Sequence, residues 1–132
     1  MEIKHLTDEN FAEETSGESL VVVDFFATWC GPCRILGPIL EDVSKELSDT
    51  KIVKVDVDEC EKTARQFGIM SIPTLVFLKN GKEIDRHIGL MNRDMLVELI
   101  NQNKWKSHKH YFYSVANSKM DLSFFVFYNL NF

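Results

Sequence analysis

The stretch VVVDFFATWCGPC, residues 21–33, joins an apolar run to two cysteines that are separated by a glycine and a proline. Residues 21–27 are almost all valine, phenylalanine or alanine, which is typical of a fully buried strand. A helical pattern follows, so Cys30 and Cys33 stand where a strand leads into a helix, as in a redox dithiol. The first N–H groups and the positive dipole end of that helix would stabilise a thiolate. We therefore expect Cys30 to be the nucleophile of a reversible disulfide.

The composition is that of a single soluble globular domain. Of the 132 residues, 45% are hydrophobic and 27% are charged, which is enough apolar material for a core. The net charge of -5 gives no sign of a nucleic-acid or anionic-membrane partner. No apolar stretch reaches the ~18 residues of a membrane span, and the N-terminus lacks the pattern of a signal peptide. Three cysteines with one close pair do not form a secretory disulfide framework, so we expect a cytoplasmic protein.

The hydrophobic pattern predicts the element order βαβαβαββα. The strongest local signal is Asn80-Gly81, which predicts a two-residue hairpin turn between two strands. Pro38 should kink the helix that contains it. Asn92 should cap the last helix, whose inward positions would be Met95, Leu96, Leu99 and Ile100. The predicted strands cover residues 2–6, 21–27, 51–57, 74–79 and 82–88, and the predicted helices cover residues 7–15 with Thr7 as cap, 33–47, 60–67 and 92–103.

Several separate motifs, taken together, resemble the thioredoxin family. A lone Cys-x-x-Cys would be a weak signal, but these motifs lie at compatible spacings over about residues 1–105. The resemblance implies an α/β thioredoxin fold, in which a central mixed five-stranded sheet is flanked by helices on both faces. The matching positions are Asp24, Trp29-Cys30-Gly31-Pro32-Cys33, Pro38, Lys54, Ile72-Pro73-Thr74 and Gly89.

The resemblance implies a dithiol mechanism for Cys30 and Cys33. Cys30 would attack a substrate disulfide to form a mixed disulfide, and Cys33 would then resolve it and release the reduced substrate. The alternative is half of a structural zinc site. No second Cys-x-x-Cys or Cys/His pair stands at a suitable spacing, and Gly31-Pro32 favours a tight redox turn, so we expect no metal.

Asp24 lies inside the apolar strand, where an ionised carboxylate is unfavourable unless it is paired. Burial should therefore raise the pKa of Asp24, unless the side chain faces a sheet edge and solvent. The resemblance places Asp24 under the dithiol, where it would handle the proton of Cys33 directly or through a water. It also brings Lys54 of the neighbouring strand close to Asp24, although a solvated strand lysine is the alternative.

Pro73 precedes a predicted strand, which is an ordinary place for a proline. The resemblance implies instead a cis bond between Ile72 and Pro73, which would bring this loop against the dithiol. The backbone groups of Ile72 would then pair with an extended substrate. Together with Trp29, Gly89 and Leu90, the loop would form a shallow apolar groove that accepts many protein segments.

Three positions next to the motifs depart from the common family pattern. Phe26 stands where tryptophan is common, Arg34 stands where lysine is common, and Gly37 precedes Pro38. We expect mild effects from these changes. Cys60 has no partner nearby in the sequence, so it receives no active role; a regulatory disulfide or glutathionylation would require it to be exposed.

Residues 106–132 differ in composition from the rest of the chain. They contain all three tyrosines and five of the ten phenylalanines, but no glycine, proline or cysteine, and three lysines against one aspartate make them net positive. The apolar run at residues 124–128 is too short for a membrane span and has the profile of a β-prone self-association segment. We expect a poorly ordered extension of unknown role after a domain at residues 1–105, with docking on the domain, partner binding and a nonfunctional extension from an altered reading of the message as alternatives.

The resemblance implies a monomeric cytoplasmic protein-disulfide reductase with no bound cofactor. Thioredoxin reductase would return electrons to the dithiol from NADPH, and the substrates would be many disulfide-containing proteins. A disulfide isomerase or oxidase would use the same motif in an oxidising compartment. A redox-inactive binding module would not need both cysteines, and a cluster-binding protein of the glutaredoxin type would need a glutathione site.

Overall fold

The computed structural model describes residues 2–106, so the predictions made for residues 107–132 fall outside the described residues. The element order is the predicted βαβαβαββα. No helix within residues 2–106 has the length and apolar character needed to cross a membrane. The strands are β1 (Lys4–His5), β2 (Val21–Phe26), β3 (Lys51–Asp56), β4 (Thr74–Lys79) and β5 (Lys82–Ile88), and the helices are α1 (Phe11–Glu14), α2 (Gly31–Glu46), α3 (Glu61–Gln66) and α4 (Arg93–Lys104).

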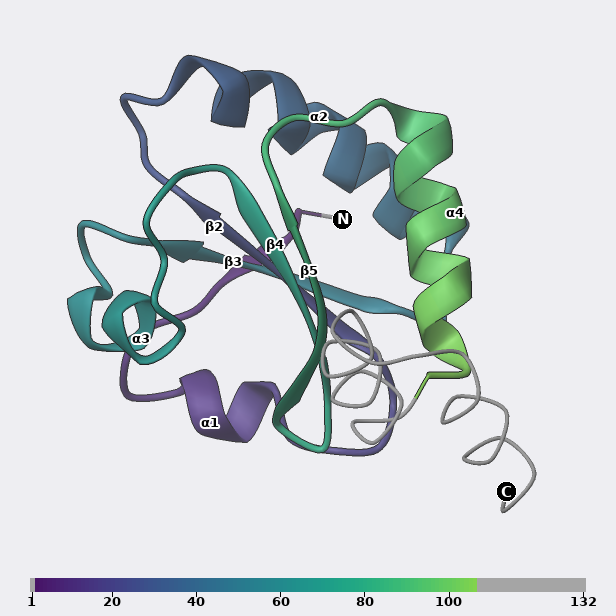
Figure 1. Cartoon of the computed structure of the whole chain (residues 1–132), viewed down its shortest axis with the longest axis horizontal. Helices are drawn as coiled ribbons and strands as arrows, with labels where there is room; N and C mark the ends of the chain where they lie inside the picture. The colour runs from purple at the N-terminus through teal and green to yellow at the C-terminus, as the bar shows by residue number, and fades with distance from the viewer. Residues whose placement is uncertain (1, 107–132) are drawn as a thin grey trace, which may run out of the picture.

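The five strands form one mixed sheet in the order β1-β3-β2-β4-β5 (Figure 1). β2 pairs in parallel with β3 and antiparallel with β4, while β1 and β5 are the edge strands. All six residues of β2 are buried, as expected for a continuous apolar run between two neighbouring strands. The predicted mixed five-stranded sheet is confirmed.

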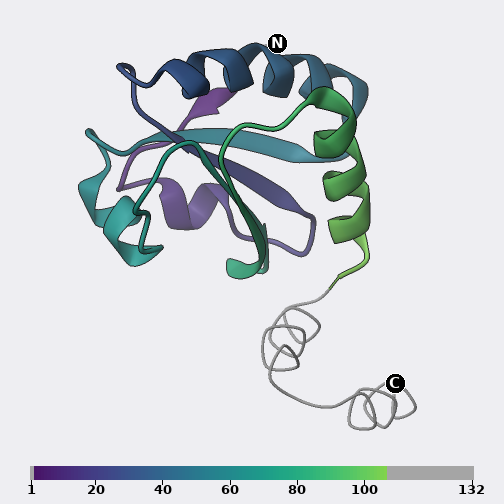
Figure 2. The same cartoon turned by 45° about the horizontal axis from the view of Figure 1, so that its top comes forward.

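The helices cover both faces of the sheet, with α2 and α4 on one face and α1 and α3 on the other (Figures 1 and 2). Alternate residues of β2 point to opposite faces, so Val22 and Val23 belong to different cores. The core under α2 and α4 includes Leu36, Leu40, Val43, Phe77, Leu96 and Ile100. The core under α1 and α3 includes Phe11, Phe25, Val55, Cys60, Val76 and Leu78.

The β4–β5 hairpin has the predicted bounds and the predicted turn. Asn80 and Gly81 both have positive φ, 53° and 72°, as a type I′ turn requires. The Asn92 cap is also confirmed, because Asn92 Oδ1 accepts a hydrogen bond from the Met95 N–H at 2.9 Å. α2 begins at Gly31, two residues before the predicted start, because a proline at position 32 fits the first turn of a helix.

The predictions for the N-terminal segment are wrong in extent. The strand predicted over residues 2–6 is only Lys4–His5, and the helix predicted over residues 7–15 is only the four residues of α1. Thr7 does make a cap-like contact, because its Oγ1 accepts a hydrogen bond from the Asn10 N–H at 3.2 Å. Asn10 Oδ1 in return accepts from the Thr7 N–H at 2.8 Å. This reciprocal pair has the form of a capping box, and the Phe11 N–H donates to the Thr7 carbonyl at 3.1 Å, although the regular helix begins only at Phe11.

One of the four inward positions predicted for α4 is wrong. Met95 is 50% exposed, whereas Leu96 and Ile100 are fully buried and Leu99 is partly buried. The buried face continues to Asn103, which a hydrophobic pattern cannot reveal because its side chain is polar. Met95 lies about 100° around the helix from Leu96, which places it beside the buried face and not on it.

The end of the described chain is held against the β4–β5 hairpin. Lys79 Nζ donates hydrogen bonds to the backbone carbonyls of Lys104 and Lys106, the second at 2.7 Å. Lys106 Nζ lies 3.4 Å from Asp85 Oδ2, which also accepts a hydrogen bond from Asn103. Lys106, assigned above to the extension, therefore contacts the domain, and we propose a domain boundary directly after it.

Ending the chain after Lys106 should leave the melting temperature nearly unchanged, because every contact just described is kept. It should also reduce light scattering, because the apolar residues 124–128 are removed. The matched control ends after Asn103 and removes both carbonyl acceptors of Lys79. Lys79 is partly buried, and this control removes its two carbonyl partners together with the contact of Lys106 with Asp85, so it should melt at a lower temperature. A comparable loss after truncation at Lys106 would show instead that residues 107–132 stabilise the fold.

Candidate active site

Cys30 directly precedes α2, and Cys33 lies in the first turn of that helix. Their sulfurs form a disulfide, and the two Cα atoms are 5.3 Å apart. The N–H of Cys33 donates a hydrogen bond to Cys30 Sγ at 3.2 Å. A free N–H at the start of a 16-residue helix is therefore directed at the sulfur of Cys30, a geometry that favours a thiolate there.

The turn that carries Cys30 is held from both sides. The guanidinium of Arg34 donates to the Thr28 carbonyl through Nε at 3.2 Å and through Nη2 at 3.0 Å. Trp29 Nε1–H donates to Asp58 Oδ2 at 2.8 Å. The indole is thus oriented next to the dithiol, although most of its surface stays exposed.

The loop before β4 lies beside the dithiol. The Ile72–Pro73 peptide bond is cis, as expected. The carbonyl oxygen of Ile72 is 3.9 Å from Cys30 Sγ, and the Ile72 side chain packs against the cluster that contains both cysteines. Gly89 donates its N–H to the Pro73 carbonyl at 2.8 Å, and its φ of +99° suits glycine. This bond joins the loop to the residues that follow β5.

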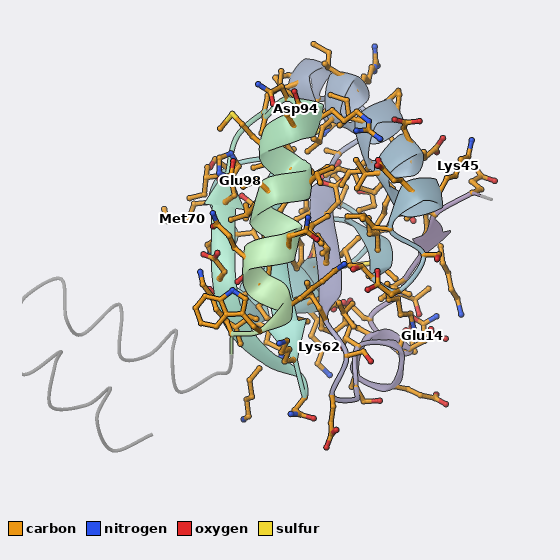
Figure 3. All side chains as sticks on the ribbon, turned by 90° about the vertical axis from the view of Figure 1, so that its right-hand side faces the viewer. Glu14, Lys45, Lys62, Met70, Asp94 and Glu98 are labelled. Atoms are coloured by element: carbon orange, nitrogen blue, oxygen red, sulfur yellow. A yellow bond between two sulfur atoms is a disulfide. The ribbon has the colours of Figure 1, made fainter. Side chains whose placement is uncertain are left out.

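The residues predicted to bind substrate differ in exposure. Trp29 and Leu90 expose 68% and 44% of their surface, whereas Pro73 is buried and Ile72 is partly buried. Met70, labelled in Figure 3, is 97% exposed on the same loop and was not predicted. An apolar residue in a loop has no helix or strand face to fill, so its loop position was the only available signal.

Asp24 is fully buried in β2, which contradicts the alternative of a solvent-facing carboxylate. Neither of its carboxylate oxygens has a hydrogen-bond partner among residues 2–106. Burial raises the pKa of Asp24 to about 7, and the positive charge of Lys54 opposes part of that rise. A carboxyl group with this pKa exchanges its proton near neutral pH, which suits a proton carrier.

Lys54 is paired in register with Asp24 across β2 and β3, but its ammonium group makes no hydrogen bond to the Asp24 carboxylate. Lys54 Nζ is 4.4 Å from the centroid of the Phe26 ring. The carboxylate of Asp24 has no hydrogen-bond partner in the described chain, so Lys54 acts on it only through space. Lys54 and Phe26 both line a cavity of about 250 Å³ that also reaches Cys33. One small space therefore adjoins a cation, an aromatic ring and the second cysteine of the dithiol.

Cys60 takes no part in this site. It is buried in the core under α1 and α3, and its Sγ–H donates to the Leu6 carbonyl at 3.4 Å. Burial raises the pKa of its thiol, and the charge of Asp8 raises it further. The regulatory alternative required an exposed thiol, so the structure gives it no support.

Comparison with known proteins identifies the family. A model of the family named Thioredoxin matches residues 2–102. The chain belongs to the thioredoxin family. It is a thiol-disulfide oxidoreductase whose active-site cysteine pair is Cys30 and Cys33.

The similar proteins are themselves thioredoxins of about the length of the matched region. Thioredoxin of Bacillus subtilis is 46% identical over 104 residues, which cover 78% of this chain and 99% of the relative. Thioredoxin of Listeria monocytogenes is 48% identical over 101 residues, which cover 76% of this chain and 97% of the relative. The crystal structure of Malassezia sympodialis thioredoxin has a TM-score of 0.72 and 38% identity, covering 77% of this chain and 90% of that one. The family match ends at residue 102, so it leaves residues 107–132 unmatched.

The buried carboxyl group of Asp24 should make the stability of the protein depend on pH. Its pKa is about 7 in the folded chain, against an ordinary value of 3.8 for an exposed aspartate. Between these two values the unfolded chain releases the proton while the folded chain retains it, so a rise in pH favours unfolding. Below 3.8 both forms are protonated, and above about 7 both are ionised, so the contribution stays constant there.

We therefore expect Asp24→Asn to gain stability over the parent as pH rises through this window. The difference between the two pKa values corresponds to about 4 kcal/mol at its upper end. Chemical denaturation at several pH values measures the gain. Asp94→Asn, at an exposed position on α4 (Figure 3), is the matched control and should gain little. An Asp24→Asn gain of equal size below and above the window would contradict the effect of burial.

Proposed function

We propose that the protein is a reductase of protein disulfides that maintains the thiol balance of the cytoplasm. The observation that supports this best is the hydrogen bond from the Cys33 N–H to Cys30 Sγ at the start of α2. A donor at this place favours the thiolate of Cys30 once the disulfide is reduced. The thiolate is the form of cysteine that attacks disulfides.

The proposed reaction has two exchange steps. The Cys30 thiolate attacks one sulfur of a substrate disulfide; a Cys30–substrate bond forms, the substrate S–S bond breaks, and the other substrate sulfur leaves as a thiolate. Cys33, which is bonded to Cys30 in the oxidised protein, then loses its proton and attacks Cys30 Sγ. The second substrate sulfur leaves. The substrate has gained two electrons, and the protein is left with the Cys30–Cys33 disulfide.

Asp24 is the proposed acceptor for the proton of Cys33, directly or through a water. A pKa of about 7 means that part of the protein carries an ionised Asp24 at neutral pH. The positive charge of Lys54 favours that ionised form. Gly31 and Pro32 serve the same reaction by shaping the first turn of α2.

Extended segments of many proteins are the proposed substrates. The Ile72 carbonyl lies next to Cys30 Sγ, which suits backbone pairing with a substrate strand. Trp29 and Leu90 offer exposed apolar surface, and Met70 enlarges it. In this proposal Pro73 and Gly89 hold the loop in place, because the Gly89 N–H binds the Pro73 carbonyl.

The Cys30–Cys33 disulfide must be reduced before another cycle begins. We propose that thioredoxin reductase supplies the two electrons from NADPH, that the chain holds no cofactor of its own, and that it acts as a monomer. Membership of the thioredoxin family supports this electron source.

Insulin reduction coupled to NADPH oxidation by thioredoxin reductase tests the function directly. We expect the full chain to support turnover. Absence of turnover with reductases from several organisms would overturn the proposal. Complete oxidation of an equimolar dithiol peptide by the Cys30–Cys33 disulfide, in the absence of NADPH and reductase, would identify an oxidase instead.

Single cysteine variants test the two roles. Cys30→Ser should abolish turnover because no nucleophile remains. Cys33→Ser should still attack but fail to resolve, so mixed disulfides should accumulate and be visible on non-reducing gels and by mass spectrometry. Cys60→Ser is the matched control and should keep its turnover, because Cys60 lies in the other core. Trapped substrate in Cys30→Ser and none in Cys33→Ser would reverse the assignment.

A further inference from the structure

Two groups contact the ring of Phe26, the last residue of β2. The ammonium of Lys54 lies 4.4 Å from the ring centroid. The His5 ring stands edge-on to the Phe26 ring, with 86° between the planes and 5.4 Å between the centroids. The three residues come from three neighbouring strands, β1, β3 and β2. A cation over an aromatic face is attracted by the ring quadrupole, and the attraction is stronger where water is partly excluded, as it is around this buried ring.

α2 leaves room for the ammonium at Gly37. A Cβ atom at this position would lie 3.6 Å from Lys54 Nζ, which is an ordinary van der Waals contact. The ammonium group therefore lies beside the α2 backbone as well as the Phe26 ring, and a large side chain at position 37 would compete for its space. Phe26 and Gly37, two departures from the common family pattern, meet at Lys54.

The charged and titratable groups near Lys54 come from every element that packs here. Arg34 is already bound to the Thr28 carbonyl, and the Asp24 carboxylate is buried with no hydrogen-bond partner in the described chain. Lys54 is thus placed to supply positive charge to Asp24, while Glu41 offers the ammonium an alternative partner on the same cavity. Within residues 2–106 the titratable and charged side chains around Lys54 are His5 on β1, Asp24 on β2, Asp56 on β3, and Cys33, Arg34 and Glu41 on α2.

We propose that Phe26 is a positioning residue whose ring holds the Lys54 ammonium at the cavity wall beside Cys33, within electrostatic reach of Asp24. A lysine side chain has four flexible carbons, so without the ring its charge would spread into solvent or move to Glu41. Its average effect on Asp24 would then fall. The ring acts through Lys54 on the proton chemistry assigned to Asp24 in the proposed function.

The ionisation of Asp24 in the oxidised protein is the direct readout, because the disulfide removes the titration of Cys30 and Cys33. Carbon NMR of labelled aspartate carboxyl groups follows it. Replacing the ring by an aliphatic side chain, Phe26→Leu, should raise the pKa of Asp24 by most of the rise that Lys54→Met produces. Phe26→Trp restores a ring and should return the pKa of Asp24 toward the parent value.

The double variant of Phe26→Leu and Lys54→Met decides between an action through Lys54 and a general change of packing. If the ring acts through Lys54, the double variant should give the same pKa of Asp24 as Lys54→Met alone. An unchanged pKa of Asp24 in Phe26→Leu would overturn the proposal. So would a further rise in the double variant, since that rise cannot pass through Lys54.

A second variant and a second assay guard against misfolding and separate the two proposals. Phe26→Met takes the place of Phe26→Leu if the latter fails to fold, which a thermal melt shows. In the insulin assay the pH dependence of turnover in Phe26→Leu should move to higher pH by the same amount as the pKa of Asp24 measured by NMR. If the pKa of Asp24 shifts in Phe26→Leu but the parent does not reduce insulin, the proposed reductase function is refuted and the role of Phe26 stands. If the parent reduces insulin but the pKa of Asp24 does not shift in Phe26→Leu, the role of Phe26 is refuted and the reductase function stands.

Discussion

The burial of β2 on both faces is the constraint on which the rest of the structure depends. All six buried residues of β2 pair with β3, and residues 21–25 also pair with β4, so the strand occupies the centre of the sheet. Two cores then form, one on each face, because alternate side chains of β2 point in opposite directions. The same burial removes water from Asp24, and this desolvation brings its carboxyl group into the range of proton exchange near neutral pH. The burial of β2 thus supplies both the hydrophobic cores and the raised pKa of Asp24.

The junction between β2 and α2 turns that constraint into a reactive site. Chain direction places the start of α2 at the end of the central strand, so the unpaired N–H groups of the helix meet the cysteines. Two other connections, the loop ending at Pro73 and the residues around Gly89, are joined by a backbone hydrogen bond, and in the proposed function they form the substrate side of the site. These connections are loops, and each is held in position by the helix or strand next to it.

The sequence predicted best what local rules decide. The hairpin bounds were exact to the residue, because Asn80-Gly81 strongly favours a two-residue turn in which both residues have positive φ. The helix of the α1 region was predicted too long: Thr7 and Asn10 form a reciprocal cap, but the regular helix lasts only from Phe11 to Glu14. In the site, the position of Cys30 at a helix start and the burial of Asp24 could both be inferred from one strand. The contact of Lys54 with Phe26 could not, because it depends on the register of three strands and on the space left by α2 at Gly37.

The lack of a hydrogen bond between Lys54 and Asp24 in the described chain has a chemical consequence. Without the charge of Lys54 the pKa of the buried Asp24 carboxyl group would be higher still, and in the proposed function it would then be a poorer acceptor for the Cys33 proton. A direct ion pair would have the opposite effect, because it would hold the carboxylate ionised and make return of the proton unfavourable. Lys54 lies between these limits, since its charge lowers the pKa of Asp24 through space while its ammonium rests on Phe26. Lys54 is the register partner of Asp24, but its ammonium group lies at the ring of Phe26. In the proposed function this placement leaves Asp24 able both to accept and to release a proton.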